Sequence, residues 1–398
     1  MKYLKLFDLD ADYQVFIEGE EFVTPNLSGT KDARIVYYNP NPIPIDYSTQ
    51  YLTFTSLEDG MTVSFNKHST SGTLNYSIDE GKTWTELTNI TPSINNGKKI
   101  MFKGDLTPYS TNGIGTYSAT KNFDVSGNAM SLLYGDDFVG QTDLTGKNYA
   151  FGDLFDGCTT VVNAKDLSLP ATTLANYCYR SMFEDCTSLT SVPELPATTL
   201  ANYCYYRMFK GCTSLTTAPE LAATTLVDNC YYGMFSGCTS LTTTHELPAT
   251  TLAGGCYQGM FWSCTSLTTA PELPATTLAK SCYQGMFGSC TSLTSVPELP
   301  ATTLTEACYS QMFQNCTSLT TAPDLPATTL ETQCYAQMFS GCTSLNYIKM
   351  LATNISAMFC LTNWVTNVSS TGTFVKSAGM NIPSGTSGIP SGWTVQEV

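Results

Sequence analysis

The sequence has little charge, and little of that charge is basic. Its 398 residues include 18 lysines and arginines against 33 aspartates and glutamates, which gives a formal net charge of −15. Charged residues make up 13% of the chain, about half of the usual share of roughly 25%. Nucleic-acid backbones and anionic membrane surfaces both attract clustered lysine and arginine, so this composition argues against either partner.

Histidine is equally scarce. His68 and His245 are the only two, which leaves few options for general-base catalysis or for a histidine-ligated metal site. We find no nucleophile–base pair, no phosphate-binding loop and no metal-ligand cluster in the sequence. We therefore expect a protein that is not an enzyme and needs no cofactor.

Long apolar runs are also missing. Lys5 and Asp8 interrupt the start before an apolar core of roughly 7–15 residues can form, so the start does not have the pattern of a signal peptide. No run approaches the roughly 18 apolar residues of a membrane span. We expect a chain that begins at Met1, is made in a reducing cytosol and does not insert into a membrane.

Cysteine, in contrast, is abundant, and its spacing reveals an internal repeat. All 16 cysteines fall into two columns whose successive members lie 26 residues apart, except that Cys158 precedes its column by 28. One column comprises Cys178, Cys204, Cys230, Cys256, Cys282, Cys308, Cys334 and Cys360. The other comprises Cys158, Cys186, Cys212, Cys238, Cys264, Cys290, Cys316 and Cys342. A unit this short cannot bury its apolar face alone, so neighbouring units must stack.

Each unit contains two patterns. Its apolar residues have the spacing of one helical face, as in Leu174, Cys178, Met182, Phe183 and Cys186. Residues 189–193 are short, β-branched and stopped by proline, which is typical of a brief strand entering a turn. The sequence therefore predicts an α/β repeat solenoid of 26-residue units, each with a short strand and a short helix.

The recurring Met-Phe-x-Gly-Cys-Thr-Ser-Leu-Thr pattern, followed by a strand that proline closes, resembles the BspA-type leucine-rich repeats. These repeats are common in surface proteins of gut and oral Bacteroidetes and in phages and prophages of those bacteria. The resemblance covers about residues 148–395. It implies a leucine-rich-repeat fold with a non-catalytic binding or adhesion role, and it implies no particular ligand.

The repeat ends and the segment before them differ from the consensus. Residues 149–158 align as a degraded first unit, Trp364 and Val368 replace the methionine and second cysteine of the last unit, and residues 388–395 could cover the final edge. Short alternating runs from residue 51 to about 126 predict an Ig-like β-sandwich. We place the sandwich at 46–130, the solenoid with its N-terminal cap at 131–368, and a C-terminal cap at 369–398.

Residues 1–45 have a different composition and end in a proline-rich linker. Their start, Met1–Phe7, together with Thr24-Pro-Asn26 and Tyr37-Tyr-Asn-Pro40, is similar to the start of many proteins from Bacteroides phages and prophages. This second resemblance implies an attachment module that joins a distal domain to other virion proteins.

Residues 77–84 match the Asp-box, Ser-x-Asp-x-Gly-x-Thr-Trp, which occurs in sialidases and other β-proteins. Its aspartate and glycine shape a hairpin turn, and its tryptophan packs beneath that turn. A sialidase would also need an arginine cluster and a tyrosine nucleophile. We therefore interpret this single copy as a folding motif.

The cysteine columns admit three interpretations. We favour a ladder of buried thiols, since free cysteine is among the most buried residue types. Disulfides between adjacent units are conceivable, although cytosolic synthesis opposes them. Metal binding is the third, but two cysteines eight positions apart without histidine do not have a zinc spacing.

An acidic column follows the same period, at Glu194, Glu220, Glu246, Glu272, Glu298 and Asp324. If stacked about 5 Å apart, these carboxylates should repel one another. They form either a solvated row of turns with screened charges or, as a weaker candidate, a site for calcium between adjacent units.

Variation between units is concentrated at a few positions, which helical spacing would direct toward solvent. It reflects either neutral drift or a recognition face, with Tyr206, Tyr232 and Trp262 as aromatic anchors. The candidate binding residues are Tyr206, Arg207, Lys210, Tyr232, Gln258, Trp262, Gln284, Gln311 and Gln337.

These features together predict a phage virion fibre or receptor-binding protein, made in the host cytoplasm, that contacts a bacterial surface protein or glycan through its repeats. A homo-oligomer such as a trimer is compatible with that role. The alternative is a bacterial cell-surface adhesin for host protein or glycan, which should carry an export signal.

Overall fold

The computed structural model describes residues 2–8, 11–17, 34–38, 46–68, 70–107 and 113–398. They belong to two compact units, Met1–Asp46 and Tyr47–Val398. The first unit is an antiparallel sheet in the order β2-β1-β3, built from β1 (Lys2–Asp8), β2 (Ala11–Ile17) and β3 (Arg34–Tyr38). Thr24–Asn26 and most of the expected linker, residues 39–44, lie outside the described residues.

The second unit opens with two β-layers. A six-stranded sheet has the order β11-β10-β4-β8-β6-β7 and comprises β4 (Leu52–Ser56), β6 (Leu74–Ser77), β7 (Thr85–Glu86), β8 (Lys99–Gly104), β10 (Phe123–Asn128) and β11 (Val161–Ser168). The smaller sheet pairs β5 (Val63–Lys67) with β9 (Gly115–Ala119). The Tyr117 ring from the smaller sheet packs 4.9 Å from Phe54 and 5.0 Å from Phe102, so aromatic burial joins the layers.

The repeats continue directly from this sheet. Strand β11 lies within the first repeats and pairs in parallel with β10, and one hydrophobic core runs through both parts. The boundary expected after residue 130 therefore does not separate two compact units. The described residues of the second unit form three short helical segments, which are η1 (Tyr47–Thr49), α1 (Ser131–Tyr134) and η2 (Gly135–Asp137). No helix in the described part of the chain is long and apolar enough to cross a membrane.

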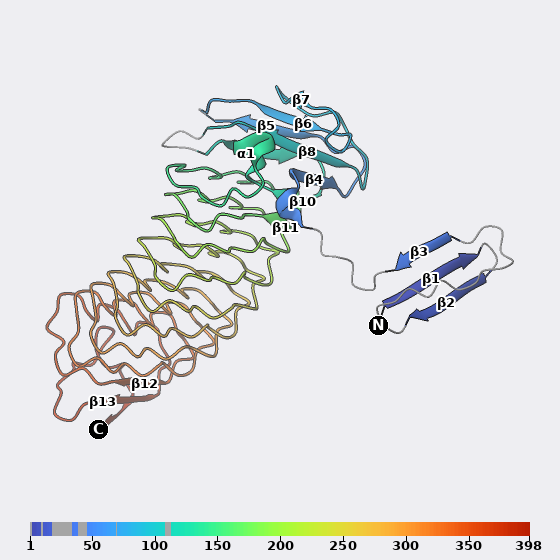
Figure 1. The fold of residues 1–398 in the computed structure, drawn as a ribbon. Coiled ribbons are helices and arrows are strands. Elements are labelled where there is room, and N and C mark those ends of the chain that lie inside the picture. Colours follow the sequence, from blue (N-terminus) through green and yellow to red (C-terminus); the bar gives the residue numbers. More distant parts are fainter. Residues whose placement is uncertain (1, 9–10, 18–33, 39–45, 69, 108–112) are drawn as a thin grey trace. The chain divides into compact units, whose positions relative to one another are not determined.

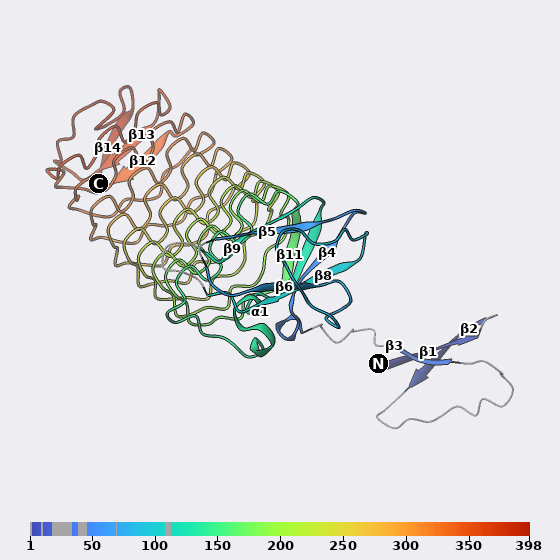
Figure 2. The same ribbon diagram turned by 90° about the horizontal axis from the view of Figure 1, so that it is seen from above.

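Between β11 and β12 (Tyr347–Met350) the chain forms coils stacked one on another (Figures 1 and 2). Single parallel bridges join residues 26 apart, such as Thr173 with Thr199 and Thr225 with Thr251. The brief strand expected at residues 189–193 is reduced to a single parallel bridge between Ser191 and Asn163, because Pro193, two residues later, has no N–H to extend a ladder. Parallel strands β12, β13 (Thr373–Lys376) and β14 (Thr394–Glu397) close the stack.

The helix expected in each unit is wrong: residues 176–185 form a series of turns. One half of their N–H groups bonds within the coil, as Cys178 N to Ala175 O (3.3 Å). The alternate half bonds to the next coil, as Tyr179 N to Cys204 O (2.9 Å). Every fourth residue, at Tyr177, Ser181 and Asp185, has a left-handed φ of 49° to 59°. This pattern turns alternate N–H groups outward along the stack, whereas a helix would consume all of them internally.

Identical side chains stack along the interior. Seven tyrosines, from Tyr179 to Tyr335, are each about 1% exposed, and neighbouring rings lie 5.6–6.2 Å apart. A parallel column of phenylalanines runs from Phe155 to Phe339. These aromatic columns bury large apolar surfaces between the coils, beside parallel columns of buried leucine, methionine and cysteine.

The ends of these columns carry different aromatic residues. Phe151 stacks on Tyr179 at 5.6 Å and occupies the tyrosine position of the first coil. At the other end, the fully buried Trp364 packs 6.5 Å from Tyr335 and 6.1 Å from Phe339. Its indole N–H donates to the carbonyl of Gly388 (2.8 Å), which ties the C-terminal tail over the last coil.

All 16 cysteines are buried and free, so the structure agrees with the thiol ladder and forms no disulfides. From Cys186 onward in the second column, the thiol donates to a phenylalanine carbonyl of the preceding coil, as Cys238 Sγ does to Phe209 O (3.1 Å). The same carbonyl accepts the N–H of Cys212 at 3.2 Å. Cysteine therefore satisfies a second lone pair that a purely apolar side chain would leave unpaired.

Candidate binding face

The outward side chains of the turn series form one surface, which we call the turn face. It comprises the residues at positions 180, 181 and 184 of the first complete unit and their equivalents at intervals of 26. The middle position has a left-handed backbone in every coil, at Gly233, Gly259 and Gly285 but also at Arg207 and Gln311. Glycine adopts this conformation freely, so the non-glycine residues depart from the local preference.

All nine predicted binding residues belong to this turn face, and each is half-buried rather than fully exposed. Their side chains lie against those of adjacent coils, which explains the difference from the helical expectation. Tyr206 stacks on Tyr232 with ring centres 4.9 Å apart. The Arg207 guanidinium lies over both rings, 4.9 Å from the first and 5.9 Å from the second.

Seven of the nine residues line one groove of about 230 Å³. They are Arg207, Lys210, Tyr232, Gln258, Trp262, Gln284 and Gln311, and they are joined by Gly233, Ser236, Gly259 and Gly285. The other two support its rim: Tyr206 backs Tyr232, and Gln337 Oε1 accepts a 2.8 Å hydrogen bond from Gln311 Nε2. The variable positions that the sequence singled out therefore converge on one hollow.

The hollow exists because small residues alternate with large ones. Trp262 lies against the next coil, where a Cβ on Gly288 would be 2.2 Å from the indole and one on Gly285 would be 3.0 Å away. Neither glycine position could hold a larger residue without displacing the ring. We did not predict Gly285 and Gly288 as site residues. Gly288 lies 26 residues after Trp262, and this pairing of a large residue with a small one in the next coil could have indicated it.

The charge of the groove is opposite to that of the chain. None of its lining residues is acidic. Lys210 pairs with Glu184 at 2.5 Å, whereas Arg207 has no acidic partner among the described residues. The groove thus offers one guanidinium that is held over aromatic rings and is free to pair with an anion.

A family model described as "BspA type Leucine rich repeat region (6 copies)" matches residues 162–270 and 255–369. These segments together span more than half of the chain. The chain belongs to the BspA-type leucine-rich repeat family. Neither a curated protein nor a solved structure matches it. The groove therefore lies within BspA-type repeats.

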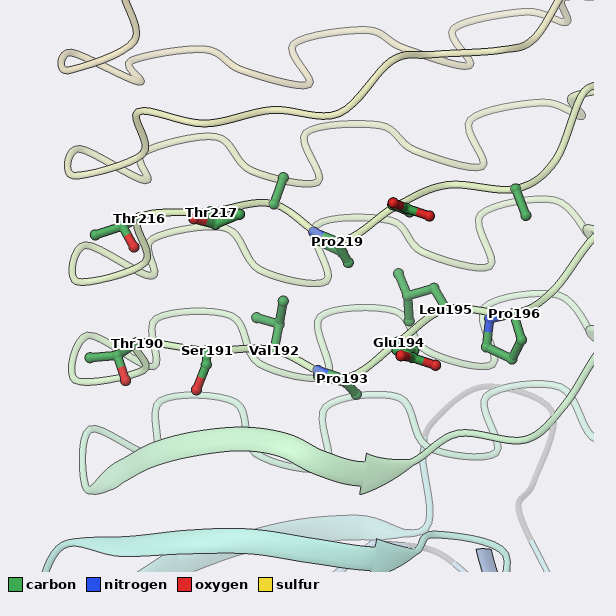
Figure 3. A pocket seen from close by; sticks show the side chains of 13 residues that line it. Thr190, Ser191, Val192, Pro193, Glu194, Leu195, Pro196, Thr216, Thr217 and Pro219 are labelled. Atoms are coloured by element: carbon green, nitrogen blue, oxygen red, sulfur yellow. The ribbon is translucent and has the colours of Figure 1, made fainter. Parts of the chain in front are cut away.

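The acidic column lies elsewhere on the BspA-type repeats, and all six of its residues are exposed. Glu194 and Glu220 line a wider pocket of about 630 Å³ between two successive coils (Figure 3). One of the charges is balanced, since Lys349 Nζ lies 2.6 Å from Asp324, and His245 Nδ1 lies 3.9 Å from Glu220. No group of three potential metal ligands occurs among the described residues.

Three further tyrosines border the turn face of the BspA-type repeats, and we did not predict them. Tyr149, Tyr177 and Tyr203 stack in sequence with ring centres 4.6 and 4.7 Å apart, and Tyr203 lies 5.8 Å from Tyr206. The recurrence of tyrosine just before the first cysteine column could have revealed them. They extend the aromatic surface from the groove toward the first coil.

The Asp-box lies before the BspA-type repeats, in the hairpin of β6 and β7. Asp79 accepts hydrogen bonds from the Thr83 side chain (2.6 Å) and backbone (2.9 Å) and from Ser77 Oγ (2.7 Å). These bonds, led by that from the Thr83 side chain, lower the pKa of Asp79 to about 2. Every hydrogen bond of this carboxylate closes the turn, which is consistent with a folding role.

Proposed function

We propose that this chain is a non-enzymatic binding protein that holds its partner on the turn face. The observation that carries the proposal is the convergence of seven variable residues on one groove, above an interior whose residues barely change. Stacked repeats offer extended surfaces on which outward side chains can change while the buried columns persist. The groove combines two aromatic rings with several polar and charged side chains, so it offers a ligand both apolar contact and hydrogen bonds.

We further propose that the protein is a phage virion fibre or receptor-binding protein that contacts a bacterial surface. This setting is supported by the modular order, in which a separate N-terminal unit precedes the repeats. That unit contains the segment similar to the start of Bacteroides phage proteins. It would join the chain to other virion proteins, and the repeats would meet the bacterium. A cell-surface adhesin that uses the same groove for host molecules is the alternative.

Labelled full-length protein, incubated with intact Bacteroidetes cells and separately with human epithelial cells, tests the binding role and its target. We expect binding to the bacteria, and we expect the triple variant Tyr206→Ala, Tyr232→Ala, Trp262→Ala to lose at least 10-fold in affinity. Lys280→Gln is the control, because Lys280 is exposed and pairs with Glu306 outside the groove. Full binding by the triple variant would contradict the proposed site.

The virion setting has its own test. Mass spectrometry of phage particles purified from a strain that encodes this chain should detect the protein in the particles. Its absence from them, together with binding to epithelial cells, would favour the adhesin instead.

A further inference from the structure

The groove on the turn face has a chemistry that narrows its ligand. We propose that it binds a carboxylated sugar, an acidic pyranose within a surface polysaccharide. This inference rests on the proposed binding role and adds the class of ligand. It follows from three features: an unpaired guanidinium, an aromatic wall and a set of amides.

The unpaired guanidinium of Arg207 is the reason to expect a carboxylate on the ligand. Arg207 has no acidic partner among the described residues, although the chain carries 33 acidic residues and a net charge of −15. Its planar fork matches the two oxygens of a carboxylate, with which it forms paired hydrogen bonds. The rings of Tyr206 and Tyr232 hold the head group in place before a ligand arrives, which lowers the entropy lost on binding.

The aromatic wall accounts for the ring. Trp262 is fixed against Gly285 and Gly288 and lines the groove across from the coil of Arg207, with glycine and Ser236 between them. A pyranose has an apolar face of C–H groups, and burying that face against an indole removes apolar surface from water. Glycine at positions 233 and 259 leaves the space for such a ring.

The amides account for the hydroxyls. Gln258 and Gln284 lie one coil apart along the groove, and the amide of each can both donate and accept hydrogen bonds. Gln311 lies beyond them and offers its Oε1 as an acceptor, since its Nε2 already donates to Gln337 and Gln314. Sugar hydroxyls require the same mixture. A phosphate or sulfate would require donors only, so glutamine would be a poor choice for those anions.

The size of the groove favours a sugar ring over a protein as its ligand. The groove measures about 230 Å³, below the roughly 300–1,000 Å³ of pockets for drug-sized ligands. The groove suits about one ring. One acidic ring within a longer polysaccharide is therefore the unit that it would hold.

Binding of the full chain to polysaccharides of known chemistry tests the proposal. The panel comprises polygalacturonate, alginate, hyaluronan and polysialic acid, with methyl-esterified polygalacturonate and poly-glutamate as controls. We expect at least one acidic polysaccharide to bind. We expect esterification, which removes charge but keeps the ring, to weaken binding at least 10-fold, and poly-glutamate, which lacks rings, not to bind.

Two variants assign that binding to the groove. Arg207→Gln places the residue found at the equivalent Gln311 and Gln337, which have the same left-handed backbone, so the variant should fold. Trp262→Ser places the residue found at the equivalent Ser236 and Ser340. Each should lose at least 10-fold in affinity with an unchanged unfolding midpoint, whereas Lys280→Gln should bind normally.

Failure of every acidic polymer to bind would overturn the proposal, and so would equal affinity for the ester or for Arg207→Gln. If cell binding is abolished in the triple variant but unchanged in Arg207→Gln, the turn face binds the partner but its ligand is not an acidic sugar. Cell binding that is unchanged in both would reject the proposed function as well.

Discussion

Inward and outward side chains alternate along the same turn segment, and yet they behave differently between coils. The inward Tyr, Met, Phe and Cys columns are repeated almost without change, whereas the outward columns contain arginine, tyrosine, tryptophan, glutamine and glycine. An inward ring packs on a copy of itself above and below, so one substitution disturbs two neighbours. An outward side chain meets solvent on one side, which tolerates change. The inward residues thus hold the coils together, and the interleaved outward residues are free to carry the recognition that we propose.

The largest test of this contrast is Phe235→Ala. Phe235 is fully buried and stacks on Phe209 and Phe261 at 5.7 and 5.6 Å. Its loss should lower the free energy of unfolding by about 3–5 kcal/mol, as measured by urea denaturation. The outward Tyr232→Ala should lower it by only about 1 kcal/mol or less. Equal losses would remove the contrast.

A smaller effect is expected for Cys238→Ala. Cys238 is fully buried and its thiol donates to Phe209 O. The variant leaves that lone pair unsatisfied and opens a small cavity, which should cost about 1–2 kcal/mol in the same denaturation experiment. Ser236→Ala, two residues away on the turn face, is the matched control and should change the unfolding free energy by less than about 0.5 kcal/mol.

Gly288→Ala tests whether an outward position can be changed at little cost in stability. The new methyl group would overlap Trp262, and the indole can move because it is a side chain at the surface. We expect easier quenching of tryptophan fluorescence by acrylamide, a loss of unfolding free energy below about 1 kcal/mol and impaired binding. Unchanged quenching would show that Trp262 does not rest on this glycine.

The smallest expected effect concerns the Asp-box hairpin, outside the repeats. The folded pKa of Asp79, about 2, lies below its unfolded value of about 3.8. The stabilising contribution is therefore fully present above pH 3.8 and is lost as the pH falls through 2. The chemical shift of the Thr83 amide, followed by nuclear magnetic resonance, should change with pH with a midpoint near 2. A midpoint near 3.8 would contradict the hydrogen bonds to Asp79.

Much of the fold could be predicted from the sequence, since columns at a fixed spacing require stacking whatever the local backbone. The helix could not be distinguished in this way, because turns that repeat every four residues also place Leu174, Cys178, Met182 and Cys186 on one side. Glycine at 233, 259 and 285 was the overlooked signal. Glycine in the middle of three consecutive helices would cost about 1 kcal/mol in each, whereas a left-handed turn favours it.

The members of the candidate site were likewise predictable, because outward residues stand out when the units are compared. Their half-buried state and the groove were not. Both depend on how a side chain of one coil leans on the next, as Trp262 does on Gly285 and Gly288. Such contacts join residues about 26 apart, which the pattern within a single unit does not contain.

The central claim is that the turn face recognises a partner without supporting the fold. The most direct test compares the parent chain with the double variant Arg207→Gln, Trp262→Ser. Urea unfolding and binding to intact bacterial cells are measured on the same samples of each protein. We predict unfolding free energies within about 1 kcal/mol of each other and a loss of at least 10-fold in cell binding. Retained binding, or a loss of binding accompanied by a large loss of stability, would contradict the claim.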